Sequence, residues 1–405
     1  MKKQIVCCTA AILLAAGGLG TLPAGTLGTA IAASAAAYED FEYSVDGDTV
    51  TITEYKGNGG DVVIPAEIDG KKVTAIGEFA FEGSDLTSVT IPDTVTSIGW
   101  EAFRYCGSLK NVTIPDSVTD FGWAAFKGCS SLKSVTLPDS VKTISTEMFM
   151  DCDILESVTI SDSVTSIESE AFAGCGSLKS VTIGKGVTEL AVDAFHGCSN
   201  LTDIKVDANN TTYCSVDGVI YSKDITALIL CPAGRTSITI PDSVKNIGSS
   251  SFSGSALTSI DIPDGVTSID SYAFKNSQNL KNVTIPESVT AIGEEAFCDC
   301  PSLRSVTLPA SVRNIGEYAL GYVTETYDCE DHYFLIEDFV LYCHPGAGKK
   351  YAKKNKIKLT DGDTSMPSDN PETGVEAPLG ALALATAESL AVLEMIAKKR
   401  KNKTD

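Results

Sequence analysis

The fold is decided by one stretch of sequence, Leu109-Lys110-Asn111-Val112-Thr113-Ile114-Pro115-Asp116-Ser117-Val118-Thr119-Asp120-Phe121-Gly122-Trp123-Ala124-Ala125-Phe126-Lys127-Gly128-Cys129, because variants of it recur along most of the 405-residue chain. Its phenylalanine returns every 22 or 23 residues, with one longer step of 57 residues. A unit this short cannot bury its own apolar side, so the period predicts a solenoid of stacked coils. The recurring positions are Phe81, Phe103, Phe126, Phe149, Phe172, Phe195, Phe252, Phe274, Phe297 and finally Leu320.

Each position in the unit has a predicted role. Val112 and Ile114 alternate with polar residues, which is typical of a short strand with one face in the core. Pro115-Asp116 favours a corner, because proline cannot donate to a strand ladder and aspartate caps turns. The segment from Val118 to Phe121 predicts a second extended stretch, and the glycine after it permits a tight backbone. Phe126 then returns the largest side chain to the core.

These residues resemble the BspA-type leucine-rich repeats of bacterial surface proteins, and the resemblance covers roughly residues 38–359. It implies a leucine-rich-repeat solenoid, mostly β, with short parallel strands stacked coil on coil. About ten repeats of 22–23 residues, one hairpin insertion and caps at both ends are expected. The expected parts are an N-terminal cap and first strand at 38–75, repeats at 76–206, a hairpin insertion at 207–235, repeats at 236–320 and a C-terminal cap at 321–359.

The N-terminal residues 1–37 are typical of a secretory signal peptide. Lys2 and Lys3 precede a mostly apolar run, Ile5–Leu19, and small residues end the segment at Ala33–Ala37. We expect cleavage within 35–38. An uncleaved membrane anchor is the alternative.

The C-terminal residues 370–405 follow a polar linker at 360–369 and resemble a sortase sorting signal. The motif Asn370-Pro371-Glu372-Thr373-Gly374 is followed by an apolar segment and a basic tail. The resemblance implies that a sortase cleaves after Thr373 and joins the protein to the cell wall. Asn370 replaces the usual leucine, and Glu388 and Glu394 interrupt the apolar segment, where an ionised carboxylate is costly. An amphipathic helix lying on a surface is the alternative.

Composition and motifs argue against several classes of function. A net charge of −22 excludes a nucleic acid as a default partner. Gly346–Lys350 resembles a phosphate loop, but Lys350 stands where Ser or Thr should hold magnesium, so we interpret the segment as the start of the closing helix. His196, His332 and His344 have no partner at metal-ligand spacing. No catalytic residue, metal site or cofactor is therefore predicted.

One aspartate recurs at the corner of the repeat. Turn capping explains this column, and a row of bound cations is the alternative, although a calcium site needs several oxygens. The residues are Asp93, Asp116, Asp139, Asp162, Asp242 and Asp264.

The cysteines of the repeat are predicted to form a column of unpaired buried thiols. Equivalent residues of adjacent coils lie about 4.8 Å apart with parallel side chains, which is longer than a disulfide prefers. Serine takes the same position in two coils, which indicates a small buried site. Cys214 with Cys231, and Cys329 with Cys343, are better candidates for pairing. The column contains Cys106, Cys129, Cys152, Cys175, Cys198 and Cys300.

The two tryptophans are the most specific signal for a binding site. Trp100 and Trp123 occupy one position of adjacent coils, where most other coils carry polar residues, so the column is expected to be exposed. With Arg104, Tyr105 and Lys127 close in register, they predict a flat aromatic platform that stacks on a sugar or anchors a protein contact. Packing of the pair over the N-terminal cap is the alternative.

Together these features predict a secreted, wall-attached and non-enzymatic binding protein. The family resemblance implies an adhesin-like role in which a monomeric solenoid binds host extracellular proteins or glycans, with sortase as a transient partner. The alternative is a structural scaffold of the bacterial envelope that binds polysaccharide or neighbouring surface proteins. The sequence does not identify the ligand.

Overall fold

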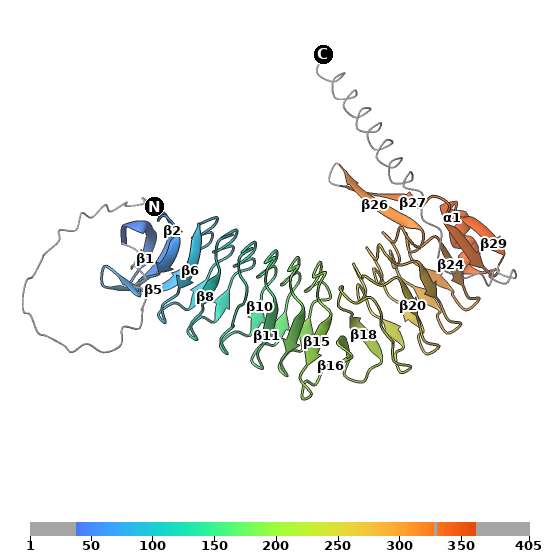
Figure 1. Ribbon diagram of the computed structural model, residues 1–405, viewed down its shortest axis with the longest axis horizontal. Helices are drawn as coiled ribbons and strands as arrows, with labels where there is room; N and C mark the ends of the chain where they lie inside the picture. The colour runs from blue at the N-terminus through green and yellow to red at the C-terminus, as the bar shows by residue number, and fades with distance from the viewer. Residues whose placement is uncertain (1–37, 328–329, 362–405) are drawn as a thin grey trace, which may run out of the picture.

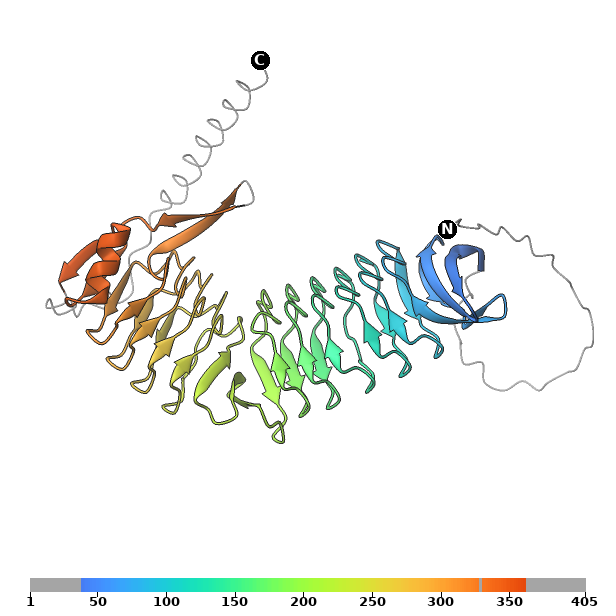
Figure 2. The same cartoon turned by 180° about the vertical axis from the view of Figure 1, so that it is seen from behind.

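The computed structural model describes residues 38–327 and 330–361. It is a β-solenoid of about 12 stacked turns, which confirms the predicted fold class. The coils follow a shallow arc from the blue N-terminal end to the red C-terminal end (Figures 1 and 2). The predicted signal peptide, residues 1–37, and the predicted sorting signal, residues 370–405, lie outside the described residues.

One row of parallel strands is formed by the segment that begins each repeat. Side chains alternate between solvent and core, as in β11, where Val158 and Ile160 are buried and the two residues between and before them are exposed. Successive strands pair without a shift, for example Val158 with Val181. The row contains β3 (Gly60–Val63), β6 (Leu86–Thr90), β8 (Asn111–Thr113), β11 (Ser157–Ile160), β13 (Ser180–Ile183), β15 (Asp203–Val206), β20 (Ser259–Asp261), β22 (Asn282–Thr284), β24 (Ser305–Leu308), β28 (Val340–Cys343) and β29 (Lys358–Asp361).

A second row of parallel strands follows each proline corner. Most of its members have two residues, the second of which is buried or nearly so, as Ile98 is. The row contains β2 (Thr49–Tyr55), β5 (Lys71–Ile76), β7 (Ser97–Ile98), β9 (Asp120–Phe121), β10 (Thr143–Ile144), β12 (Ser166–Ile167), β14 (Glu189–Leu190), β18 (Ala227–Leu230), β19 (Asn246–Ile247), β21 (Ser268–Ile269), β23 (Ala291–Ile292) and β25 (Asn314–Ile315).

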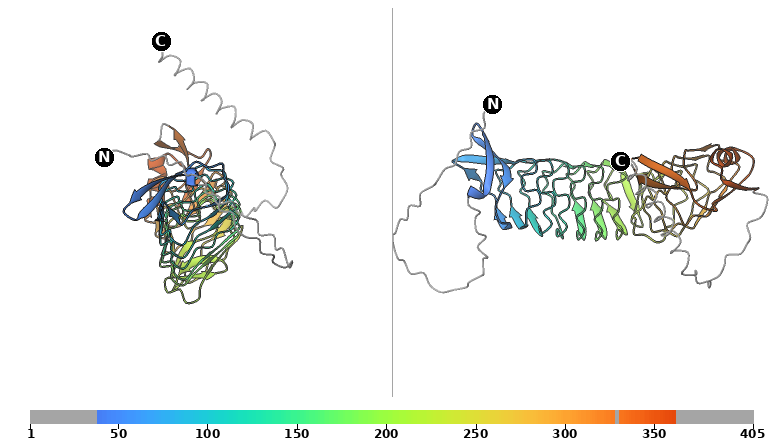
Figure 3. Two further views of the ribbon diagram at one scale, coloured as in Figure 1. Left: turned by 90° about the vertical axis from the view of Figure 1, so that its left-hand side faces the viewer. Right: turned by 90° about the horizontal axis from the view of Figure 1, so that it is seen from above.

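The core contains a column of phenylalanine rings, one per coil. Phe103, Phe126, Phe149 and Phe172 stack with centroids 5.2–5.6 Å apart and planes within 12° of parallel. The column stops after Phe195 and resumes at the 252 coil, and the buried residues accordingly form two separate apolar clusters. The boundary between them is here called the seam. Figure 3 shows the stacked coils along the rod and from its end.

The remaining elements are added to this rod. At the N-terminal end, η1 (Tyr38–Asp40) leads into β1 (Phe41–Asp46), which pairs antiparallel with β2, and β4 (Glu67–Ile68) pairs with β5. The predicted insertion contains β16 (Tyr213–Val216) and β17 (Val219–Ser222), and β17 pairs antiparallel with both β16 and β18. A second antiparallel hairpin, β26 (Tyr322–Tyr327) with β27 (Glu330–Leu335), was not predicted; it projects on the concave side of the arc (Figure 1).

The cysteine column is buried and bonded to the backbone. Each thiol donates to the carbonyl of a phenylalanine in the preceding coil, as from Cys106 Sγ to Phe81 O at 3.0 Å. Ser277 makes the same bond to Phe252 O at 3.0 Å, which explains why serine substitutes here. Cys106, Cys129, Cys152, Cys175, Cys198 and Cys300 are all free thiols.

One suggested disulfide is absent from the structure. Cys214 and Cys231 are both free thiols, and their Sγ atoms lie against the carbonyls of Ser222 and Pro232. The suggestion of a disulfide between these two residues was therefore wrong, because each thiol is directed at a local carbonyl. For the other suggested pair, Cys329 lies outside the described residues.

Candidate binding surface

Trp100 and Trp123 lie in adjacent turns, directly after the second strand of each coil. The two residues are 52% and 39% exposed, so the column is solvent-facing, as expected. The ring centroids are 6.1 Å apart, but the planes are tilted by 51°. The expectation of a flat platform was therefore wrong: the two indoles form an angled pair.

The tilt has a local cause at Gly122. A Cβ atom at this glycine would overlap the backbone nitrogen and Cδ1 of Trp100, so the indole lies against a position that carries no side chain. Trp123 follows Gly122 directly. In the next coil the residue equivalent to Gly122 is Ser145, so Trp123 has no glycine at the corresponding place. The glycine was expected to permit a tight backbone; the structure shows that it permits a close approach between coils.

Arg104, Tyr105 and Lys127 form a second group on the same turns. The Arg104 guanidinium lies 4.5 Å from the centre of the Tyr105 ring, and the Tyr105 amide donates to Lys127 O at 2.7 Å. Arg104 also pairs with the buried carboxylate of Glu101, and Lys127 Nζ lies 2.5 Å from Glu147. In the part of the chain that is described, no hydrogen bond, ion pair or ring contact joins this group to the indoles.

Ion pairing sets the electrostatics of this group. Bonding to Tyr105 and Glu101 raises the pKa of Arg104, and bonding to Glu147 raises the pKa of Lys127. Both cations are therefore retained and locally neutralised. The turns consequently present aromatic and hydrogen-bonding groups without a strong net charge, which suits a glycan or a polar protein surface more than a highly charged ligand.

One corner aspartate, Asp162, makes contacts with the following coil. Asp162 Oδ2 lies 2.9 Å from Lys185 Nζ, the residue that replaces aspartate in the following coil, and its other oxygen accepts the Lys185 amide. These bonds lower the pKa of Asp162. Over residues 38–327 and 330–361, no group of three or more His, Cys, Asp and Glu side chains has a geometry that could hold a metal ion.

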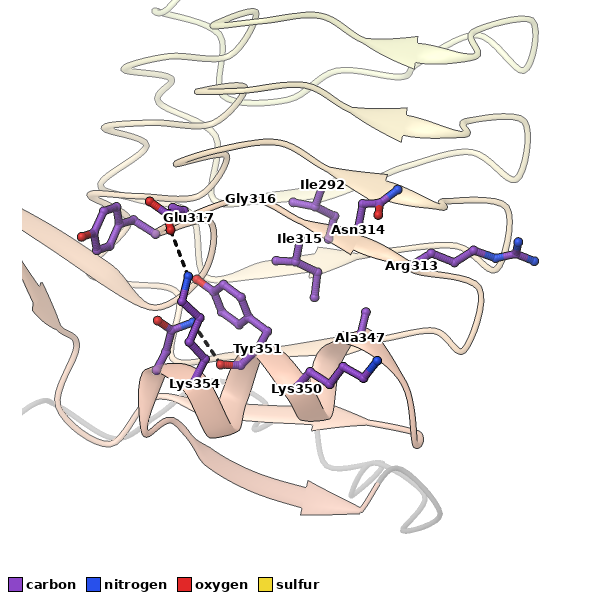
Figure 4. Close-up of a pocket in the computed structure, with 12 residues that line it drawn as sticks. Ile292, Arg313, Asn314, Ile315, Gly316, Glu317, Ala347, Lys350, Tyr351 and Lys354 are labelled. Atoms are coloured by element: carbon purple, nitrogen blue, oxygen red, sulfur yellow. Dashed lines mark hydrogen bonds and ion pairs between the residues drawn. The ribbon is translucent and has the colours of Figure 1, made fainter.

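The described part of the rod contains a cavity near its C-terminal end and another at the seam. The larger, of about 580 Å³, lies between β25 and α1 (Ala347–Asn355), and Figure 4 shows Arg313 and Lys350 on its rim. Gly346, which was compared with a phosphate loop, precedes this helix, so the interpretation as a helix start is confirmed. Lys354 pairs with Glu317 at 2.9 Å across the cavity.

The smaller cavity, of about 390 Å³, lies at the seam and includes His196. Sequence reasoning missed it.

A model of the BspA-type leucine-rich repeat region matches residues 74–202 and 231–327, with six copies of the repeat. These ranges cover more than half of the chain. The protein belongs to the BspA-type leucine-rich repeat family. The described part of this family member contains no helix with the length and hydropathy that a membrane span requires.

A solved structure that is 32% identical supports the same assignment. A leucine-rich cell surface protein from Faecalibacterium prausnitzii A2-165 is 32% identical, with 75% of this chain and 86% of that chain covered and a TM-score of 0.57. The pneumococcal vaccine antigen PcpA is 20% identical, with 80% and 96% covered and a TM-score of 0.49. A search of curated proteins gave no match.

Proposed function

We propose that this BspA-type protein is a non-enzymatic, adhesin-like binding protein of the bacterial cell surface whose solenoid binds host extracellular proteins or glycans. The family and the similarity to a leucine-rich cell surface protein of Faecalibacterium prausnitzii support the surface location. The observation that carries the binding role is the exposure of Trp100 and Trp123 on one side of the rod. Large exposed aromatic residues are costly to leave in water and are enriched at binding hot spots.

The geometry of the pair suits a ligand that enters between the rings. The two planes meet at 51°, so each indole presents a different face, and Tyr105 adds a third ring that is 50% exposed on the same turns. A sugar ring or an extended side chain of a protein fits such an angled pair. Binding of such a ligand does not require the two indole rings to lie in one plane.

Replacing both tryptophans with alanine is expected to weaken ligand binding about 100-fold or more, because hot-spot tryptophans contribute at least about 2 kcal/mol each. The measurement is binding of the protein to a panel of extracellular-matrix proteins, mucins and polysaccharides. Val192→Ala is the matched control, since Val192 occupies the same column and is 38% exposed but lies three coils away from Trp123. Equal binding by the parent and the folded double variant would refute the site.

The same panel separates the two roles. Saturable binding to host proteins or host glycans supports the adhesin. Binding restricted to bacterial polysaccharides or to other envelope proteins would support the envelope scaffold instead.

We further propose that sortase attaches the protein to the cell wall through Asn370–Gly374. Thr373→Ala is expected to release nearly all of the protein from the peptidoglycan fraction, because the resemblance implies that sortase recognises the threonine side chain at the residue where it cleaves. Glu372→Ala is the control, since the motif tolerates any residue there. Wall fractions are compared by immunoblotting after muramidase digestion. Unchanged wall attachment of Thr373→Ala would show that another mechanism anchors the protein.

A further inference from the structure

At the seam, Cys231 occupies the position that phenylalanine holds in the regular coils. In those coils the phenylalanine amide donates to the residue before the next phenylalanine, as from Phe172 to Ala194 O. The Cys231 amide makes the equivalent bond to Ser251 O at 2.8 Å, one residue before Phe252. Cys231 therefore takes the backbone position of the phenylalanine in this coil, and its small side chain lines the seam cavity.

The shortened turn after Cys231 borders the seam cavity. The coil continues from Cys231 through Pro232 to Gly234 and has no counterpart of the turn that precedes phenylalanine elsewhere. The cavity of about 390 Å³ has an apolar floor that includes Phe195, Leu201 and Leu230. Its rim is polar, and includes Glu170, Asp193, His196, Tyr272, Lys275 and Asn276.

Hydrogen-bonding groups of the interrupted ladder line this cavity without partners. The hydroxyl of Ser251 is buried, with the residue only 1% exposed, and has no hydrogen bond. Within the described chain, no backbone carbonyl accepts the amide of the buried Phe195, and no backbone amide donates to Ser253 O. Buried polar groups are normally satisfied, so this concentration is unusual.

The last coil of the series shows how the protein satisfies a backbone amide at the phenylalanine position. Leu320 holds the phenylalanine position in the last coil of the series, and its amide bonds to the hydroxyl of Tyr351 at 3.0 Å. Tyr351 belongs to α1, which lies against that coil (Figure 4). The equivalent amide at the seam, that of Phe195, lies on an open cavity instead.

We propose that the seam cavity binds a peptide segment of a partner protein that carries an aromatic side chain. The ring packs beside Phe195 on the apolar lining of the cavity, and the peptide backbone takes the place of the missing turn. A polypeptide carries both an acceptor for the Phe195 amide and a donor for Ser253 O, so it matches both walls of the cavity. Glu170 and Asp193 on the rim favour a basic residue beside the ring.

The test uses a capped peptide that copies residues 124–128 of this chain, Ala-Ala-Phe-Lys-Gly, titrated into the purified protein by calorimetry. Saturable binding with a dissociation constant of roughly 10 µM to 1 mM is expected for a ligand of this size. The same peptide with alanine in place of phenylalanine is expected to bind at least about tenfold more weakly, because it loses burial of the ring.

Two variants test the location. Cys231→Phe places a ring on the lining of the cavity, so it is expected to fill the cavity and to abolish peptide binding. Ser251→Ala introduces the residue that most coils carry before phenylalanine, so it is expected to fold normally and weaken binding severalfold. It remains informative if Cys231→Phe fails to fold. Trp100→Ala with Trp123→Ala should leave peptide binding unchanged, which separates this inference from the proposed function.

Absence of saturable peptide binding, or equal binding by the alanine peptide, would overturn the proposal. Binding of a free monosaccharide in place of the peptide would also overturn it, since the cavity would then be a saccharide site. Unchanged affinity in a folded Ser251→Ala or Cys231→Phe variant would show that the peptide binds elsewhere.

Discussion

Phe149→Ala is expected to lower the free energy of unfolding by about 3–5 kcal/mol, the range found when a fully buried aromatic side chain is truncated. Phe149 is completely buried between Phe126 and Phe172, with ring centroids at 5.6 and 5.5 Å. The coils on both sides are held by their own backbone bonds, so they cannot collapse into the space. The measurement is chemical denaturation followed by circular dichroism.

Phe195→Ala is the matched comparison for Phe149→Ala. Phe195 stacks on Phe172 at 5.4 Å but borders the seam cavity on its other side. Its truncation enlarges an existing cavity and removes one ring contact instead of two, so the loss is expected to be clearly smaller. If the two variants lost the same stability, the ring column would not be acting as a continuous stack.

The repeated parts of this molecule were predictable because each position of the repeat occurs again in every coil, and each occurrence is independent evidence for its role. Ile114 and Phe126 each have about ten counterparts of similar character, so their burial follows from the period alone. The serine that replaces cysteine in two coils likewise indicated a small buried site. Ser277 confirms this by making the bond that its cysteine counterparts make.

The unrepeated parts were less predictable for the same reason. The tilt of Trp100 depends on Gly122 in the next coil, and a sequence pattern gives no ring orientation. The step of 57 residues concealed the fact that Cys231 occupies a phenylalanine position, because a cysteine in an insertion carries no such signal. The β26–β27 hairpin was also missed, since its residues belong to no repeat.

The seam also shows how a defect in a repeat protein can become useful. In a regular solenoid each coil satisfies the backbone groups of its neighbour, and specific ligands must use exposed side chains. Where one coil loses its turn, the interior of the ladder becomes accessible at that coil only. The angled tryptophan pair and the seam cavity are therefore the two places where this rod departs from its repeat and where we propose that it binds a ligand.

Raising the pH from 7 to 10 is expected to destabilise the protein by several kcal/mol through its buried thiols. Burial raises the pKa of Cys106, Cys152 and Cys300 from 9.0 to about 12. Between pH 9 and 12 the unfolded chain loses these protons while the folded chain keeps them. The folded state then binds more protons than the unfolded state, so stability falls as pH rises. At pH 10 each thiol contributes a loss of about 1.4 kcal/mol.

Cys152→Ser isolates this effect from other alkaline titrations. Serine does not ionise in this range, and Ser277 shows that a serine at this position donates to the same phenylalanine carbonyl. The variant is therefore expected to retain its fold and to lose about 1.4 kcal/mol less than the parent between pH 7 and pH 10. Denaturant unfolding in the presence of a non-thiol reductant measures both differences. If parent and variant lost equal stability between pH 7 and pH 10, the Cys152 thiol would have to be accessible to water or ionised in the folded protein. Only a thiol that keeps its proton because it is buried makes the stability of the parent fall more than that of the variant.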